Sequence, residues 1–266
     1  MNLIIQYYND KNVERQKEYD FCLEMNLKNP AIKKIYNIIE KETIIPEKFI
    51  NNKKLVNLPF DYSKSGNVDG RLTFKYAFEF AKDNIKSDEI ICIINLDIFV
   101  GHSTEWLNLK EHLFNIDKKI ALSLSRYEYY WDKSYKIEHS QWNGASSDAW
   151  IFLNPIENIT DCNFAVGNAP GCDATIARRF FNAGYKIFNW AEKYKLFHVD
   201  ICRGHKNGIM IITEKTDSEA RRALLRGRLD CTPYQNWEEI LNNNILPKYK
   251  LSEQGKSRQV FGSVEY

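Results

Sequence analysis

The stretch that decides the fold class is Glu89–Phe99, EIICIINLDIF. This nearly continuous apolar run predicts a central strand that is buried on both faces of a parallel sheet. The run closes on the polar triplet Asn95-Leu96-Asp97. Because ligands of open α/β sheets bind beyond the carboxyl ends of the strands, this triplet marks the first place to search for a site.

Outward from this stretch, the chain alternates between strand and helix patterns, which indicates an α/β fold. The predicted strands are Leu3–Tyr8, Lys34–Ile39, Lys54–Leu58, Ile120–Ser125, Ala149–Leu153, Tyr185–Asn189 and Lys195–Val199. The predicted helices are Val13–Leu27, Leu72–Ile85, Trp106–Leu113, Ala174–Ala183, Ser218–Leu229 and Trp237–Leu241. We therefore expect a central mixed, mostly parallel sheet that is flanked by helices.

Composition excludes several classes of protein. The 266 residues include 37 Lys and Arg against 35 Asp and Glu, a balance that argues against binding to nucleic acid. The apolar runs are too short for a transmembrane segment, and the opening MNLIIQYYND lacks the features of a signal peptide. The six cysteines form no CxxC pair, so we expect reduced thiols and a cytoplasmic location.

Asp97 is the first candidate site residue. A carboxylate at the end of a buried strand costs free energy unless it is paired or bound to a metal. Its oxygen would suit Mg²⁺ or Mn²⁺, which keep waters and phosphate oxygens as further ligands. The alternative is that Asp97 only caps the turn after the strand.

Two later segments carry further candidates. Asp173 stands at the start of a predicted helix, where it serves either as an N-cap or as a general base. The helix dipole would keep this carboxylate ionised at neutral pH. His198 follows a short strand and is either a metal ligand or a structural histidine. Arg203 and Lys206 would neutralise phosphate or belong to a solvated basic loop.

The order of these elements resembles nucleotide-sugar-dependent glycosyltransferases of the GT-A fold. The family places an R-x-x-x-x-x-A-F-like helix before an apolar strand that ends in a D-x-D motif. It then has an x-E-D motif opening a helix that ends in AGY, and finally a metal-binding histidine. The matching segments here are Arg71–Phe78, Asn95-Leu96-Asp97, Gly171-Cys172-Asp173, Ala183-Gly184-Tyr185 and His198, within roughly residues 3–205.

The resemblance implies a single GT-A-like domain over residues 1–266. Residues 1–100 would form the nucleotide-binding half, 101–213 the acceptor and catalytic half, and 214–266 a C-terminal helical extension. The implied reaction moves a sugar from a UDP- or GDP-sugar to a hydroxyl of a carbohydrate acceptor. Mn²⁺ or Mg²⁺ would neutralise the diphosphate of the leaving group.

The resemblance also assigns roles to individual residues. Asp97 and His198 would hold the metal. Asp173 would be the catalytic base, and Asp148 would be a second base candidate, a partner of acceptor hydroxyls or only a turn residue before a strand. The residues expected to contact the donor are Gln6, Tyr8, Asn9, Arg71, Asn95 and Arg203. Aromatic side chains in the segment 127–150 would face the acceptor or pack in the core.

Two departures from the family pattern keep other functions open. Asn95 replaces the first acid of D-x-D, and Cys172 replaces the first acid of x-E-D. Either change would suit weaker metal dependence, a retaining mechanism that needs no base, or a non-catalytic carbohydrate-binding or scaffold protein. A sugar-nucleotide nucleotidylyltransferase is a further alternative, but it usually carries a glycine-rich loop after the first strand, and residues 7–13 contain no glycine.

Overall fold

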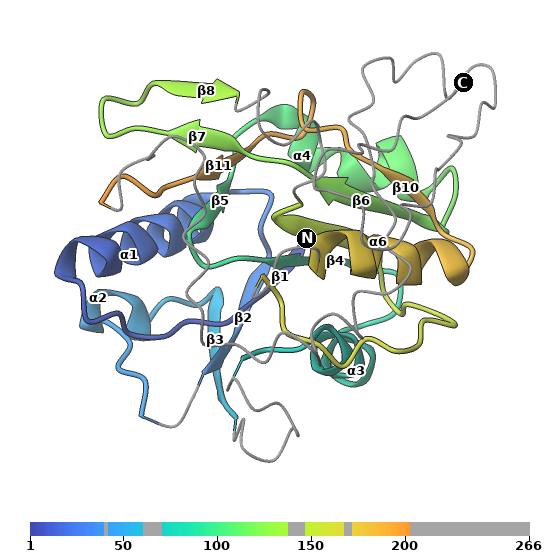
Figure 1. Cartoon of the computed structure of the whole chain (residues 1–266), viewed down its shortest axis with the longest axis horizontal. Helices are drawn as coiled ribbons and strands as arrows, with labels where there is room; N and C mark the ends of the chain where they lie inside the picture. Colours follow the sequence, from blue (N-terminus) through green and yellow to red (C-terminus); the bar gives the residue numbers. More distant parts are fainter. Residues whose placement is uncertain (40–41, 61–70, 138–146, 168–171, 203–266) are drawn as a thin grey trace, which may run out of the picture.

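The computed structural model of the chain describes residues 1–39, 42–60, 71–137, 147–167 and 172–202 (Figure 1). The two helices predicted after residue 214, the extension over 214–266 and Arg203 therefore lie outside the described residues. None of the helices in the described part of the chain has the length and apolar character that crossing a bilayer requires.

A seven-stranded main sheet, in the order β10-β6-β9-β4-β1-β2-β3, forms the centre of the molecule. Its strands are β1 (Asn2–Ile5), β2 (Lys34–Ile39), β3 (Leu55–Pro59), β4 (Ile90–Ile94), β6 (Ile120–Leu124), β9 (Ala149–Leu153) and β10 (Lys186–Phe188). β9 runs antiparallel to both of its neighbours, and every other pair is parallel. The sheet is therefore mixed and mostly parallel, as the sequence predicts.

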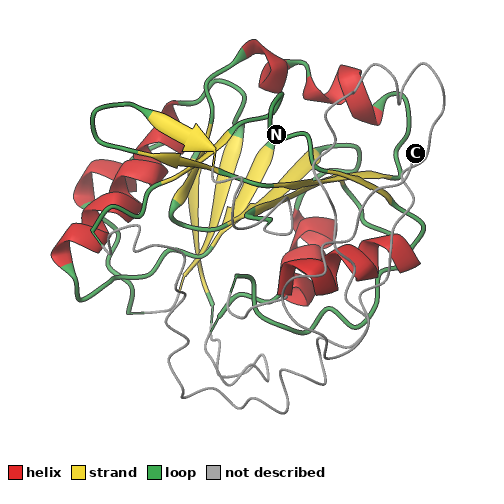
Figure 2. Ribbon diagram, turned by 45° about the horizontal axis from the view of Figure 1, so that its top comes forward, coloured by secondary structure: helices red, strands yellow, loops and turns green. Residues whose placement is uncertain are grey.

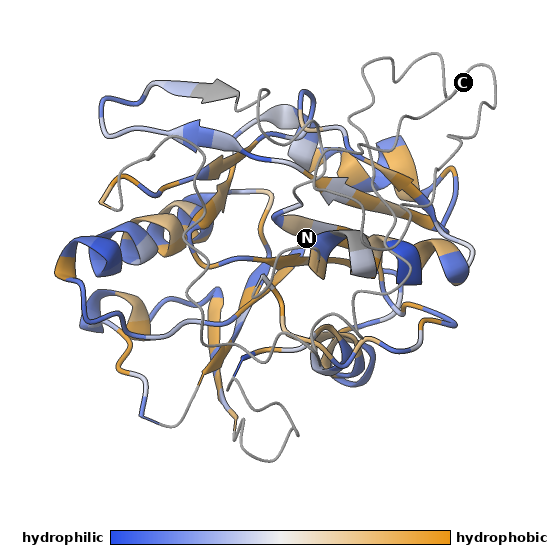
Figure 3. Ribbon diagram, in the orientation of Figure 1, coloured by the Kyte–Doolittle hydropathy of each residue, from blue (hydrophilic) through white to orange (hydrophobic). Residues whose placement is uncertain are grey.

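Helices cover both faces of the main sheet (Figure 2). One hydrophobic cluster joins Leu3 and Ile5 to helix α1 (Val13–Lys28), and the other joins Ile4 to helices α3 (Phe74–Asn84) and α6 (Cys172–Asn182). Successive strand residues point to opposite faces, so the apolar strands fill both layers of the core. The orange strands at the centre of Figure 3 show this concentration of apolar residues. The remaining helices are α2 (Glu47–Ile50), α4 (Thr104–Leu107) and a π-helical turn at Lys110–Phe114.

The predicted single strand over Glu89–Phe99 is wrong in one respect. β4 ends at Ile94, and after a turn the chain begins β5 (Ile98–Val100) in a different, four-stranded sheet. This second sheet has the order β5-β11-β7-β8, with β7 (Tyr127–Tyr129), β8 (Tyr135–Ile137) and β11 (Leu196–His198). Both short strands are fully buried, so their apolar residues alone do not reveal that the chain changes sheets at the polar triplet between them.

Two other elements differ from expectation. The predicted strand Leu3–Tyr8 ends at Ile5, because the amide of Tyr7 donates to the side chain of Asn37 at 2.9 Å. The predicted helix Trp106–Leu113 is divided into α4 and the π-helical turn. The segment between β6 and β9, for which the sequence predicts no strand, contains the antiparallel pair of β7 and β8.

Candidate active site at the junction of the two sheets

Asp97 lies in the turn where the chain passes from β4 to β5, between the main sheet and the second sheet. Its backbone carbonyl accepts a hydrogen bond of 3.0 Å from the amide of Val199, directly after β11. This contact brings the end of β11 to the carboxyl end of β4. Asp97 and His198, the two predicted metal ligands, therefore lie side by side.

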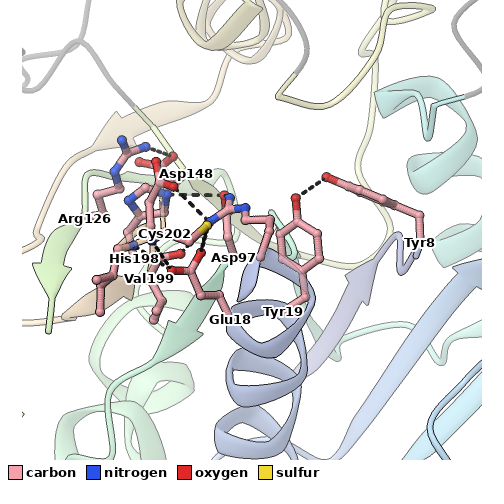
Figure 4. Close-up of polar contacts among 12 residues, drawn as sticks. Tyr8, Glu18, Tyr19, Asp97, Arg126, Asp148, His198, Val199 and Cys202 are labelled. Atoms are coloured by element: carbon pink, nitrogen blue, oxygen red, sulfur yellow. Dashed lines mark hydrogen bonds and ion pairs between the residues drawn. The ribbon is translucent and has the colours of Figure 1, made fainter. Parts of the chain in front are cut away.

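His198 contacts two carboxylates, one through each ring nitrogen, and Figure 4 shows it beside the first of them, Asp97. Its Nε2 lies 3.3 Å from Oδ2 of Asp97, and its Nδ1 lies 2.7 Å from Oε2 of Glu128. The His198 side chain is only 5% exposed. Burial and the charge of Arg126 act to lower the pKa of His198, but the two carboxylates outweigh them and raise it. Without a metal, the two carboxylates therefore favour the protonated form of His198.

Arg15 of α1 is a second cation on Asp97. Its Nη2 donates to Oδ2 of Asp97, the same oxygen that faces His198. Burial acts to raise the pKa of Asp97, but His198 and Arg15 outweigh it and hold the pKa well below its ordinary value. Arg15 also lies over the ring of Tyr19, at 4.6 Å from the ring centroid. The Asp97 carboxylate is consequently ionised and fixed in position.

Arg126, in the link between β6 and β7, contacts Glu128 and one further buried acid, Asp148. Its Nε donates to Oε1 of Glu128 at 2.9 Å, and its Nη1 donates to Oδ1 of Asp148 at 2.6 Å. Burial acts to raise the pKa of Glu128, but the hydrogen bond from His198 and the charge of Arg126 hold it at about 2. An unbroken series of side-chain contacts thus runs from Asp97 through His198, Glu128 and Arg126 to Asp148.

Asp173, in the first turn of α6, lies beside the far end of this series. Its Oδ2 accepts a hydrogen bond of 3.4 Å from the amide of Ser147, the residue before Asp148. Burial first, and the charge of Asp148 second, raise the pKa of Asp173 to about 7. The expectation that the helix dipole keeps Asp173 fully ionised at neutral pH is therefore wrong. A carboxyl group that titrates near 7 is suited to accept or donate a proton at neutral pH.

The predicted donor residues divide into two groups. Gln6 and Arg71 lie together, because Oε1 of Gln6 accepts a hydrogen bond of 2.7 Å from the amide of Leu72. Tyr8 is connected to the Asp97 cluster, since its hydroxyl lies 2.9 Å from that of Tyr19.

The other two described donor candidates are held elsewhere. Asn9 is fastened to the backbone of Ile44 by two hydrogen bonds, so the structure does not bring it to Asp97. The side chain of Asn95 packs against Gly167, where an added Cβ would lie 2.6 Å from its Oδ1. Gly167 also has a φ of +66°, so only glycine suits this close approach.

Asp97 and His198 fit a divalent cation. Metal bonds of ~2.1 Å at right angles put neighbouring donor atoms roughly 3 Å apart, close to the observed 3.3 Å. A metal-ligating histidine also normally donates its other ring N–H to a carboxylate, the position that Glu128 has here.

A second group, Glu18, Asp200 and Cys202, has ligand atoms within 4.8 Å of one another. However, Glu18 already accepts hydrogen bonds from the amides of Ile201 and Cys202, both at 2.7 Å, and from Arg15 at 2.7 Å. Because both oxygens of Glu18 are engaged, we assign this group to holding the chain after β11 against α1.

Sequence reasoning missed Arg15, Glu128 and Arg126. Arg15 continues the buried face of α1, at helical spacing before Tyr19 and Cys22, so extending that periodicity would have found it. Glu128 alternates with Tyr127 and Tyr129 along one strand and so points to the opposite face. Nothing local in the sequence distinguishes Arg126 from a surface arginine.

Three solved structures are similar in fold to this chain. One is GalNAc-T7 with UDP, GalNAc and Mn²⁺, at 9% identity and a TM-score of 0.47, covering 75% of this chain and 43% of that one. Another is TarS 1-349 of S. aureus in complex with UDP-GlcNAc, at 12% identity and a TM-score of 0.44, covering 75% and 58%. The third is the mannosyltransferase PcManGT of Pyrobaculum calidifontis in complex with GDP-Man and Mn²⁺, at 10% identity and a TM-score of 0.47, covering 84% and 59%.

These likenesses concern the fold alone, and the chain spans about half the length of the structures it matches. No family model matches the chain. No curated protein matches it either.

Proposed function

We propose that this chain is a glycosyltransferase that moves a sugar from a nucleoside-diphosphate sugar to a hydroxyl group of a carbohydrate acceptor. The observation that carries the proposal is the pairing of Asp97 with His198 at the carboxyl end of β4, backed by Glu128. This edge of the sheet is where α/β proteins bind ligands. A carboxylate and an imidazole at this spacing suit a divalent ion that binds phosphate oxygens.

Asp97 and His198 would hold Mn²⁺ or Mg²⁺. When bound, the ion would neutralise the negative charge that develops on the departing diphosphate. Glu128 fixes the orientation of His198 through Nδ1, and Arg15 keeps Asp97 ionised and immobile. These contacts hold both ligands in place before the donor arrives, which reduces the free-energy cost of binding it.

The donor nucleotide would lie along the end of β1. Gln6 and Arg71 lie together there, and Tyr8 reaches the Asp97 cluster through Tyr19. Tyr8 offers a ring for stacking on the base. Asn9, Asn95 and Arg203 are the remaining proposed donor contacts, and Asn9 would have to leave the backbone of Ile44 to take part.

Asp173 would deprotonate the acceptor hydroxyl. Its pKa of about 7 leaves a large fraction ionised at neutral pH and makes it a stronger base than an ordinary aspartate. Asp148 is the second base candidate, but one of its oxygens is engaged by Arg126 at 2.6 Å. We therefore assign Asp173 as the base and Asp148 as a contact for acceptor hydroxyls.

A panel of UDP- and GDP-sugars tests this proposal by thermal unfolding, with and without Mn²⁺. A donor that binds only the folded state at 100 times its Kd stabilises the protein by about 2.7 kcal/mol. We expect one sugar nucleotide to raise the Tm strongly with Mn²⁺, and to be hydrolysed slowly when no acceptor is present. If no sugar nucleotide in the panel raises the Tm, the proposal is wrong.

The second candidate function is non-catalytic carbohydrate binding. It is favoured by Arg15, which already neutralises the metal-facing oxygen of Asp97, and by Asn95 in place of an acid. This candidate predicts that sugars raise the Tm equally with Mn²⁺ and with EDTA, and that no sugar nucleotide is hydrolysed. The same panel therefore distinguishes the two functions.

A further inference from the structure

We infer that Arg126 is a positioning residue that joins the metal-holding end of the site to its acid–base end, by holding Glu128 and Asp148 at once. The inference rests on the proposed function. Arg126 stands where the chain leaves β6 of the main sheet and enters β7 of the second sheet. Its guanidinium therefore bridges groups from both sheets, and Figure 4 shows its contact with Asp148.

At the metal-holding end, Arg126 acts through Glu128. It occupies Oε1 of this carboxylate at 2.9 Å and leaves Oε2 to accept from His198 at 2.7 Å. The Glu128 side chain is 4% exposed, so it is held by these two partners rather than by bulk water. Loss of the group that orients a ligating histidine typically lowers metal affinity 10–100-fold.

At the acid–base end, Arg126 acts through Asp148. The groups that face Asp173 from the described residues are Asp148 before β9, Arg126 before β7, and the Cys172 thiol and Ser147 amide. The negative charge of Asp148 raises the pKa of Asp173, and the positive charge of Arg126 lowers it. Removing Arg126 removes the charge that lowers this pKa, so Asp173 will titrate at a higher pH.

A purely structural role makes a different prediction. If Arg126 only compensates two buried carboxylates, its loss lowers the Tm but changes neither metal affinity nor the titration of Asp173. Two measurements that need no turnover separate the roles. They are Mn²⁺ binding by calorimetry and the ¹³C carboxyl titration of Asp173 by NMR, both on the full chain.

Three variants test the two contacts of Arg126 together and one at a time. We expect Arg126→Gln to weaken Mn²⁺ binding ~10–100-fold and also to raise the midpoint of the Asp173 titration. Glu128→Gln should weaken Mn²⁺ binding while leaving the Asp173 midpoint near that of wild type. Asp148→Asn should lower the Asp173 midpoint while leaving Mn²⁺ affinity near that of wild type.

A folded Arg126→Gln protein that changes only one measurement, or neither, overturns the inference. If Arg126→Gln does not fold, Arg126→Lys decides, because lysine offers one nitrogen and does not reproduce the fork of arginine. For Arg126→Lys we expect a change in the Mn²⁺ affinity, in the midpoint of the Asp173 titration, or in both. If both stay at their wild-type values, the inference is overturned. If the wild-type chain does not bind Mn²⁺, the metal assignment is overturned together with the inference. If the wild type binds Mn²⁺ and Arg126→Gln binds it equally well, only the inference is overturned.

Discussion

Nε2 of His198 lies 3.3 Å from Oδ2 of Asp97, although the two residues are 101 positions apart in the chain. The contact depends on β11 pairing antiparallel with β5, which sets His198 opposite Ile98, the residue after Asp97. Strand register thus places the two proposed metal ligands side by side. A one-residue slip of β11 would turn His198 to the opposite face of the second sheet.

Asp97→Asn should abolish Mn²⁺ binding and sugar-nucleotide turnover, because it removes the charged oxygen that faces His198. It should also lower the free energy of unfolding by ~1.5–3 kcal/mol, through loss of the charged hydrogen bond to Arg15. Titration calorimetry measures the loss of Mn²⁺ binding, and urea denaturation measures the loss of unfolding free energy. Asp200→Asn is the matched control, since Asp200 also accepts from Arg15, at 3.2 Å, and should leave Mn²⁺ binding intact. Full wild-type activity in excess EDTA would contradict the metal assignment.

Asp173→Asn should reduce turnover by ~10²–10⁴-fold while donor affinity stays close to wild type, because a general base acts only on the chemical step. In the wild type, the base is active when ionised, so kcat should fall as the pH drops below about 7. This limb of the pH profile should disappear from the residual activity of the variant. Asparagine is as good a helix cap as aspartate, so a pure capping role predicts near-full turnover instead.

The same substitution should stabilise the protein at alkaline pH. The pKa of Asp173 is raised from 3.8 to about 7 by folding, so the folded state binds more protons than the unfolded state between these values. Stability is therefore lost as the pH rises from 3.8 to about 7. A shift of about three units corresponds to roughly 4 kcal/mol at most, since solvent screening of this half-buried group reduces it. Urea unfolding of Asp173→Asn at pH 5 and pH 8 should show the gain chiefly at pH 8.

Arg71→Ala should weaken donor binding by ~1–3 kcal/mol, the scale of a hydrogen bond to a charged group. The reason is the position of Arg71 beside Leu72, which Gln6 anchors at the end of β1. Lys75→Ala is the control, because Lys75 is an exposed cation one turn further on that pairs with Glu79 at 3.8 Å. Equal donor affinities in the two variants would show that the nucleotide binds elsewhere.

Local sequence determined the α/β class, most of the strands and helices, and the placement of Asp97 at a strand end. These features follow from periodicity and polarity over a few neighbouring residues, and Lys34–Ile39 and Ala149–Leu153 are observed with the predicted bounds. Only the tertiary structure decided that the chain changes sheets after Ile94, because both short strands are equally apolar and buried.

The electrostatics of the site were likewise decided by tertiary structure alone. Arg15 meets Asp97 across 82 positions of sequence, and Glu128 meets His198 across 70. The pKa of Asp173 depends on burial and on Asp148, which belongs to a different element. A short stretch of sequence shows which residues can ionise. The free energy of ionising each of them depends on how far folding removes it from water and on which charged partners folding brings near it.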